Sequence, residues 1–148
     1  MHNPSSREVV ALALNRKPVS KTTKLSSIEL LSQHGVYWHS VTSRFKSPPT
    51  YLAFYYDSKL QSIHHVEDCE EVSTAKDSRL LGRQRAKAPK FSKPTLVFKL
   101  GAAVQPRTDI PVGKVFRGQE MPCSLLHLFT SPTVKAAWLR SAAKKRAA

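Results

Sequence analysis

The sequence predicts an α+β protein with a small mixed or antiparallel sheet that curls or forms an open pseudobarrel, flanked by short helices. Three observations lead to this fold class. Runs rich in aromatic and β-branched residues recur in the middle of the chain, helix-capping signals precede two apolar runs, and the last third has helical spacing. The 148 residues suffice for one domain, expected over residues 26–140, between a basic tail or loosely docked helix with its linker (1–25) and a basic tail (141–148).

Helix-capping signals mark the beginning of the chain. Residues 5–8 match a capping box, so the apolar run 9–14 is expected to form a short helix. Residues 15–25 are polar and basic, which is typical of a linker. A second capping box at residues 26–29 predicts another helix, and Gly35 is placed to end it.

Strand signals dominate the next part of the chain. Residues 36–41 and 51–56 are rich in aromatic and β-branched side chains, and each run predicts a strand. The short polar segment 57–59 predicts a tight turn into a strand over 60–72, so that the two runs form a β-hairpin. Residues 94–100 predict a further strand.

The remaining segments complete the predicted order of elements. Residues 74–93 lack apolar periodicity and predict a long loop, which in compact domains is usually functional or disordered. A short strand is expected over 112–118. A short helix is expected over 124–129, and another begins with Pro132 in its first turn.

Charge points to the class of partner. The chain holds 24 Lys and Arg against 10 Asp and Glu, a formal net charge of +14. Bases concentrate in residues 73–99 and at both ends of the chain, whereas residues 57–72 are acidic. This segregated excess of positive charge favours a polyanion, above all a nucleic acid, as the partner.

Composition also argues against several classes of protein. No apolar run approaches the roughly 18 residues that span a bilayer, so no membrane contact is expected. Two cysteines in 148 residues do not make a disulfide-rich secreted module, and a reducing compartment, cytoplasmic or nucleoid-associated, is expected. Because no glycine-rich nucleotide-binding motif occurs, no cofactor is expected. The sequence does not determine the oligomeric state.

The order of these elements resembles a known family. The aromatic run 51–57 leads into His65-Val66-Glu67, and a basic loop, the strand 96–100 and a closing Leu-rich helix follow. This order is similar to that of the PUA-like superfamily, the small pseudobarrels that include EVE and ASCH domains, over about residues 36–140. The resemblance implies binding of RNA, or of DNA with modified bases, in a cleft with an aromatic wall.

The leading hypothesis is therefore a non-enzymatic nucleic-acid-binding domain, with RNA and DNA both left open. The basic loop is expected to contact phosphates, and exposed strand aromatics are expected to stack on bases. The phosphate-binding candidates are Arg79, Arg83, Arg85, Lys87, Lys90 and Lys93, with Arg44 and Lys46 beside the hairpin, and the stacking candidates are Trp38 and Tyr55.

Two alternatives stay open. The basic surface could dock an acidic protein partner, and the acidic segment 64–71 could serve a metal-dependent nuclease. On a strand, His65, Glu67, Cys69 and Glu71 would share one face, and Val66 would share the other with Asp68. Because no second ligand pair with matching spacing occurs, no metal-binding or catalytic residue is assigned. Cys123 lies near His127, but no orienting acid accompanies them.

Overall fold

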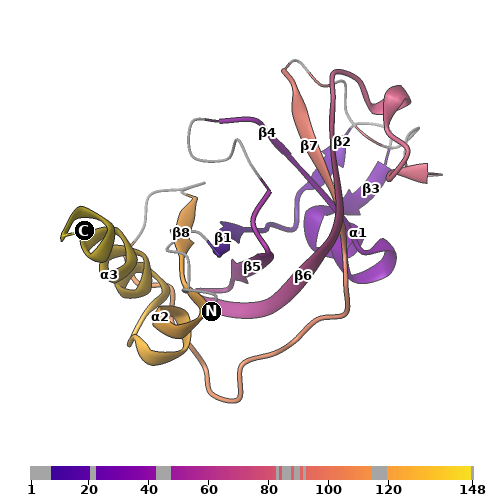
Figure 1. Cartoon of the computed structure of the whole chain (residues 1–148). Coiled ribbons are helices and arrows are strands. Elements are labelled where there is room, and N and C mark those ends of the chain that lie inside the picture. Colours follow the sequence, from indigo (N-terminus) through magenta and orange to yellow (C-terminus); the bar gives the residue numbers. More distant parts are fainter. Residues whose placement is uncertain are drawn as a thin grey trace. The chain divides into compact units, whose positions relative to one another are not determined.

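The computed structural model has the predicted α+β fold (Figure 1). It describes residues 8–20, 23–42, 48–82, 84, 88, 91, 93–114 and 120–147. The strands in this part of the chain are β1 (Val9–Ala13), β2 (Pro18–Ser20), β3 (Thr23–Ser26), β4 (Val36–Ser40), β5 (Tyr51–Tyr56), β6 (Lys59–Val72), β7 (Thr95–Leu100) and β8 (Met121–Cys123). The helices are α1 (Ser27–His34), α2 (Leu125–Thr130), α3 (Val134–Ala147) and the 3₁₀ helix η1 (Ala75–Asp77).

The described strands pair into a six-stranded mixed sheet, in the order β4-β7-β6-β5-β1-β8, and a two-stranded sheet of β2 and β3. All neighbouring strands are antiparallel except β1 and β5, which are parallel. The contacts group the chain into two compact units. Unit 1 comprises residues 1–14, 49–65 and 103–148, and unit 2 comprises residues 15–48 and 66–102. The single domain expected over residues 26–140 stays a prediction.

The apolar run near the N-terminus forms a strand, so the helix expected over residues 9–14 is wrong. In unit 1, β1 pairs with β5 on one edge and with β8 on the other. Val9 and Ala11 have no exposed surface. A short apolar run fits a buried strand as well as a buried helix, and pairing on both edges decides for the strand.

The predicted hairpin of β5 and β6 is confirmed. Asp57 and Ser58 connect the two strands, and both have positive φ angles, 52° and 64°. Two such residues between antiparallel strands make the tight turn whose twist matches that of a hairpin. The turn sets the register beside it, with Tyr55 opposite Leu60, and a one-residue shift beyond Tyr55 then places Tyr51 opposite His65 at the far end of the pair.

The C-terminal segment of unit 1 follows the prediction in part. The predicted helix after residue 123 is confirmed as α2, whose first turn is capped by the Ser124 hydroxyl. Pro132 lies before α3 and not in its first turn, because Thr133 caps that helix by accepting the Ala136 N–H. Residues 112–114 form no strand, and the rest of the strand expected over 112–118 lies outside the described residues.

Unit 2 begins with the small β2–β3 sheet, where a linker was expected over residues 15–25. The predicted capping box is confirmed: the Ser26 hydroxyl accepts the Glu29 N–H at 3.2 Å, and the Glu29 carboxylate accepts the Ser26 N–H at 3.3 Å. Gly35 ends α1 in the left-handed conformation, with φ of 64°. A Cβ there would lie 3.3 Å from the Leu100 carbonyl oxygen, so glycine suits both the angle and the space.

The strands predicted over residues 36–41 and 94–100 are confirmed as β4 and β7, which pair with each other. The second half of β6 pairs with the other edge of β7. Among the described residues, no helix is long and apolar enough to cross a bilayer.

The burial of β1 predicts opposite results for the same substitution at two alanines. Ala11 is fully buried, and Ala13 on the same strand is exposed. We expect Ala11→Glu to lower the free energy of unfolding by more than about 3 kcal/mol, because it buries an unpaired charge. Ala13→Glu should change it by less than about 0.5 kcal/mol. Urea denaturation followed by circular dichroism measures both, and equal effects would contradict the assignment of β1.

Candidate nucleic-acid interface

One face of the unit 2 strands carries both an aromatic and an acidic side chain. Trp38 on β4 and Glu70 on β6 both lie opposite Val97 of β7. Side chains of directly opposed residues point to the same face of a sheet. Trp38, Val97 and Glu70 therefore form a row across three strands, and we call the surface that they share the Trp38 face.

The described part of the basic segment 74–93 packs on the Trp38 face. Ala75 and Leu81 are buried with Val97 in one apolar cluster, against which Trp38 and Phe91 also pack. The rings of Trp38 and Phe91 have their centroids 6.0 Å apart at an interplanar angle of 54°. The segment expected as a long loop is thus anchored to the sheet at several points.

The Glu70 carboxylate holds the beginning of this segment. It accepts hydrogen bonds from the Leu80 N–H at 2.9 Å, from the Arg79 N–H at 3.3 Å and from the Ser78 hydroxyl. The Ser78 hydroxyl in turn accepts the Leu81 N–H at 3.1 Å. Ser78 and Leu81 are buried, so the bonds of the Ser78 hydroxyl satisfy polar groups that are shielded from water.

Arg79 leaves this anchored turn and pairs with a second carboxylate of β6. Its Nη2 lies 3.0 Å from Oδ2 of Asp68, and the side chains are 75% and 45% exposed. The other oxygen, Oδ1, accepts the Cys69 N–H at 2.8 Å, which orients the Asp68 carboxylate. The pair is therefore formed at the surface, within reach of a dissolved anion.

A β-bulge in β6 determines the face of the sheet to which the Asp68 and Glu70 carboxylates point. The pairing register shifts between Val66, which lies opposite Leu100, and Asp68, which lies opposite Lys99. Leu100 and Lys99 are adjacent on β7 and point to opposite faces of the sheet, so their partners Val66 and Asp68 also point to opposite faces. The prediction that Val66 and Asp68 share one face is therefore wrong. A bulge inserts one residue and so resets the alternation of side chains.

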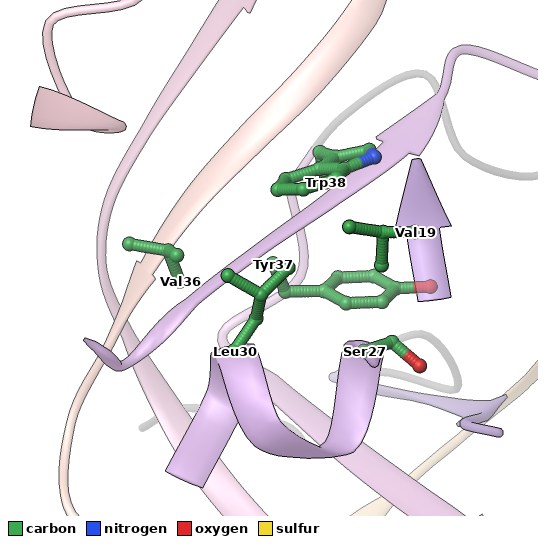
Figure 2. Close-up of a pocket in the computed structure, with 6 residues that line it drawn as sticks. All are labelled: Val19, Ser27, Leu30, Val36, Tyr37 and Trp38. Atoms are coloured by element: carbon green, nitrogen blue, oxygen red, sulfur yellow. The ribbon is translucent and has the colours of Figure 1, made fainter. Parts of the chain in front are cut away.

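A solvent-open hollow of about 240 Å³ lies at β4, and all the residues that line it belong to unit 2. In Figure 2 the Tyr37 ring extends from β4 toward Val19 of β2, and the Trp38 ring lies on the other side of the β4 ribbon. The Tyr37 ring also lies 6.3 Å, between centroids, from the ring of buried Phe98. The lining residues are Val19, Ser27, Leu30, Val36, Tyr37 and Trp38.

The structure brings some of the predicted contact residues together in unit 2. Arg79 and Lys93 are exposed on the basic segment, and Trp38 is half-buried beside it. Six further candidates lie outside the described residues, and their role in phosphate binding stays a prediction: Arg44, Lys46, Arg83, Arg85, Lys87 and Lys90.

Tyr55 lies away from this group, in the core of unit 1. Its exposed fraction is 6%, and burial raises the pKa of its phenol. The pairing of β5 with β6 shifts between Phe54 and Tyr55, and both side chains are buried. Because a buried ring cannot stack on a base, we leave Tyr55 out of the proposed interface.

The acidic segment of β6 makes no recognisable metal site. Within the part of the chain that the structure describes, no three His, Cys, Asp or Glu side chains are grouped so that they could hold a metal ion. Asp68 and Glu70 instead accept hydrogen bonds from residues 78–80. His64 is buried, and its Nε2 lies 2.9 Å from the Ser62 hydroxyl.

The two cysteines are in environments that disfavour thiolates. Burial, with a smaller effect of the Glu8 carboxylate, raises the pKa of Cys123 to about 12. Burial also raises the pKa of Cys69 to about 11, assisted by the charges of neighbouring carboxylates, Asp68 first. A reactive cysteine has a lowered pKa, so neither thiol has the character of a nucleophile.

Some residues that line the hollow at β4 come from other elements and were not predicted from the sequence. Leu30 and Val19 line the hollow because tertiary contacts bring α1 and β2 to β4, which no local signal indicates. A signal for η1, which precedes the anchored turn, was present in the sequence. Residues 74–77 match the [ST]-x-x-[DE] pattern, and the Thr74 hydroxyl just before η1 donates to the Asp77 carboxylate at 2.8 Å.

Comparisons with known proteins add a resemblance of fold. No family model and no curated protein matches the chain. A crystal structure of a mutant of ZmASCH from Zymomonas mobilis superposes with a TM-score of 0.47 and 13% identity, over 74% of this chain and 77% of that one. A likeness at this level concerns the arrangement of the backbone and says nothing of function.

The Glu70 anchor predicts a stability difference between adjacent carboxylates. Glu70→Ala removes the acceptor of three donors, and we expect the free energy of unfolding to fall by about 2–3 kcal/mol. Glu71→Ala removes the same charge from an exposed side chain on the opposite face and should cost less than about 0.5 kcal/mol. Urea denaturation gives both values, and amide exchange at Leu80 should accelerate in Glu70→Ala alone. Equal losses would contradict the anchor.

Proposed function

We propose that this protein binds nucleic acid without acting on it chemically, through the basic segment and the Trp38 face of unit 2. The observation that carries the proposal is that exposed cations and an aromatic pair share one segment: Arg79 and Lys93 lie on the basic segment whose Phe91 packs on Trp38. Proteins that hold single strands combine these two features, a basic path for the backbone and aromatic rings for the bases.

The phosphate contacts of this proposal come from the basic segment. Arg79 is 75% exposed and anchored at its backbone, so its side chain extends into solvent from a fixed point of the segment. Lys93 is exposed just before β7. We assign the same role to the other six cations named from the sequence. Four belong to the basic segment, where closely spaced charge can track a backbone of regularly spaced phosphates, and the other two, Arg44 and Lys46, lie between β4 and β5 in the sequence.

The base contacts come from the Trp38 ring, which packs beside the basic segment and also lines the hollow at β4. The walls of the hollow are largely apolar and aromatic, with the Ser27 hydroxyl at one side. The hollow is open to solvent, and its apolar and aromatic lining can accept the face of one planar ring. A base can enter only when it is unstacked, and we therefore propose a single strand or an unpaired loop as the preferred substrate.

The test of phosphate contact is the dependence of binding on salt. For a single strand of about 12 nucleotides, the eight assigned phosphate contacts give a slope of about −5.6 in a plot of log affinity against log salt. We expect Arg79→Gln with Lys93→Gln to reduce this slope by about 1.4. The matched control, Arg107→Gln with Lys114→Gln, removes two exposed cations of unit 1 and should leave the slope unchanged.

The test of base contact uses the two tryptophans of the chain. In Trp138→Phe the remaining Trp38 should lose fluorescence when the single strand binds, because a base lies against its ring. In Trp38→Phe the remaining Trp138 reports from the core cluster of unit 1 and should not respond. A flat salt dependence would overturn the proposal. Competition by heparin and acidic proteins, but not by nucleic acid, would favour the alternative of an acidic protein partner.

A further inference from the structure

Arg79 occupies a special position among the described cations of the basic segment, because its guanidinium already has an anionic partner. Asp68 Oδ2 lies 3.0 Å from Nη2 of Arg79, and among the described residues Lys93 has no such ion pair. A nucleic-acid phosphate that binds Arg79 through the same nitrogen must therefore displace a carboxylate of the protein itself. From this geometry we infer that Asp68 is an internal competitor that tunes the strength and selectivity of the proposed interface.

The position of Asp68 is set by the backbone and not by the ion pair. The bulge in β6 turns Asp68 to the Trp38 face, and the Cys69 N–H holds its Oδ1 at 2.8 Å. Oδ2 consequently stays directed toward the segment whether or not Arg79 is bound. A competitor held in place in this way re-forms its pair as soon as the phosphate leaves.

The ion pair between Arg79 and Asp68 is weak enough for a phosphate to compete with it. Both side chains are substantially exposed, and exposed ion pairs change an equilibrium by only about two- to five-fold. The Arg79 backbone remains bound to Glu70 when the pair opens, so release of the guanidinium does not require the turn to unfold. The pair can therefore open and close at the surface without a cost in the core.

The consequence is selectivity for a long anion over a small one. An isolated phosphate or a mononucleotide must displace Asp68 with a single contact. A nucleic-acid strand held by the other cations presents its next phosphate at high local concentration, and this favours displacement. Asp68 thus disfavours small phosphate compounds more than it disfavours a polynucleotide. This inference rests on the proposed nucleic-acid binding.

The test compares two neutralised carboxylates of β6. Asp68→Asn keeps an oxygen for the Cys69 N–H but removes the charge that faces Arg79. Glu67→Gln removes the same charge from an exposed neighbour on the same strand. We expect Asp68→Asn to tighten binding of a single-stranded oligonucleotide about two- to five-fold and to steepen its salt slope by up to about 0.7. Glu67→Gln should do neither beyond a small general effect of charge.

Two further measurements separate competition from a change in structure. In the Arg79→Gln background, Asp68→Asn should have no more effect than Glu67→Gln, because the residue with which Asp68 competes is gone. Inorganic phosphate should displace the oligonucleotide from Asp68→Asn at lower concentration than from the unaltered protein. Thermal unfolding checks that all variants are folded.

The outcomes distinguish this inference from the proposed function. Failure of the unaltered full chain to bind any oligonucleotide would overturn the proposed function, and this inference with it. Binding by the unaltered chain, with Asp68→Asn and Glu67→Gln indistinguishable, would overturn the inference alone. A gain in affinity that persists in the Arg79→Gln background would also overturn it.

Discussion

The candidate interface depends on one carboxylate, that of Glu70. Two backbone N–H groups and a buried hydroxyl of residues 78–80 donate to it. Hydrogen bonds to a charged acceptor are among the stronger ones in proteins, and a buried donor without a partner is costly. Through this contact a basic segment without apolar periodicity acquires a fixed beginning on the sheet, next to the aromatic row.

The bulge in β6 makes this contact possible. In a regular strand, Asp68 and Glu70 would follow the alternation set by the β5–β6 hairpin, but the inserted residue reverses the faces beyond Val66. Asp68 and Glu70 then point to the face of Trp38 and Val97. One irregularity of the backbone thereby directs the acidic side chains toward the basic segment, where they act as its anchor and as a partner of Arg79.

The aromatic and electrostatic parts of the site contribute in different ways. Trp38 and Phe91 pack on each other and on a buried apolar cluster, so little side-chain freedom is left to lose when a ligand binds. Arg79 and Asp68 are exposed, and salt and competing anions weaken their attraction. Under the proposed function, the exposed charges would contact the phosphates of a nucleic acid, and the rigid aromatic side chains would stack on one base.

The amino-acid sequence alone determined the features that depend on neighbouring residues: the Ser26 capping box, the Gly35 helix end, the hairpin turn at Asp57 and the concentration of positive charge. Tertiary structure decided the rest. It made the run at Val9 a strand through pairing on two edges, and it buried Tyr55 in the core cluster of unit 1. It also joined Arg79 to Asp68, eleven residues apart, through a bulge. These outcomes depend on partners distant in the chain, whose positions local periodicity does not encode.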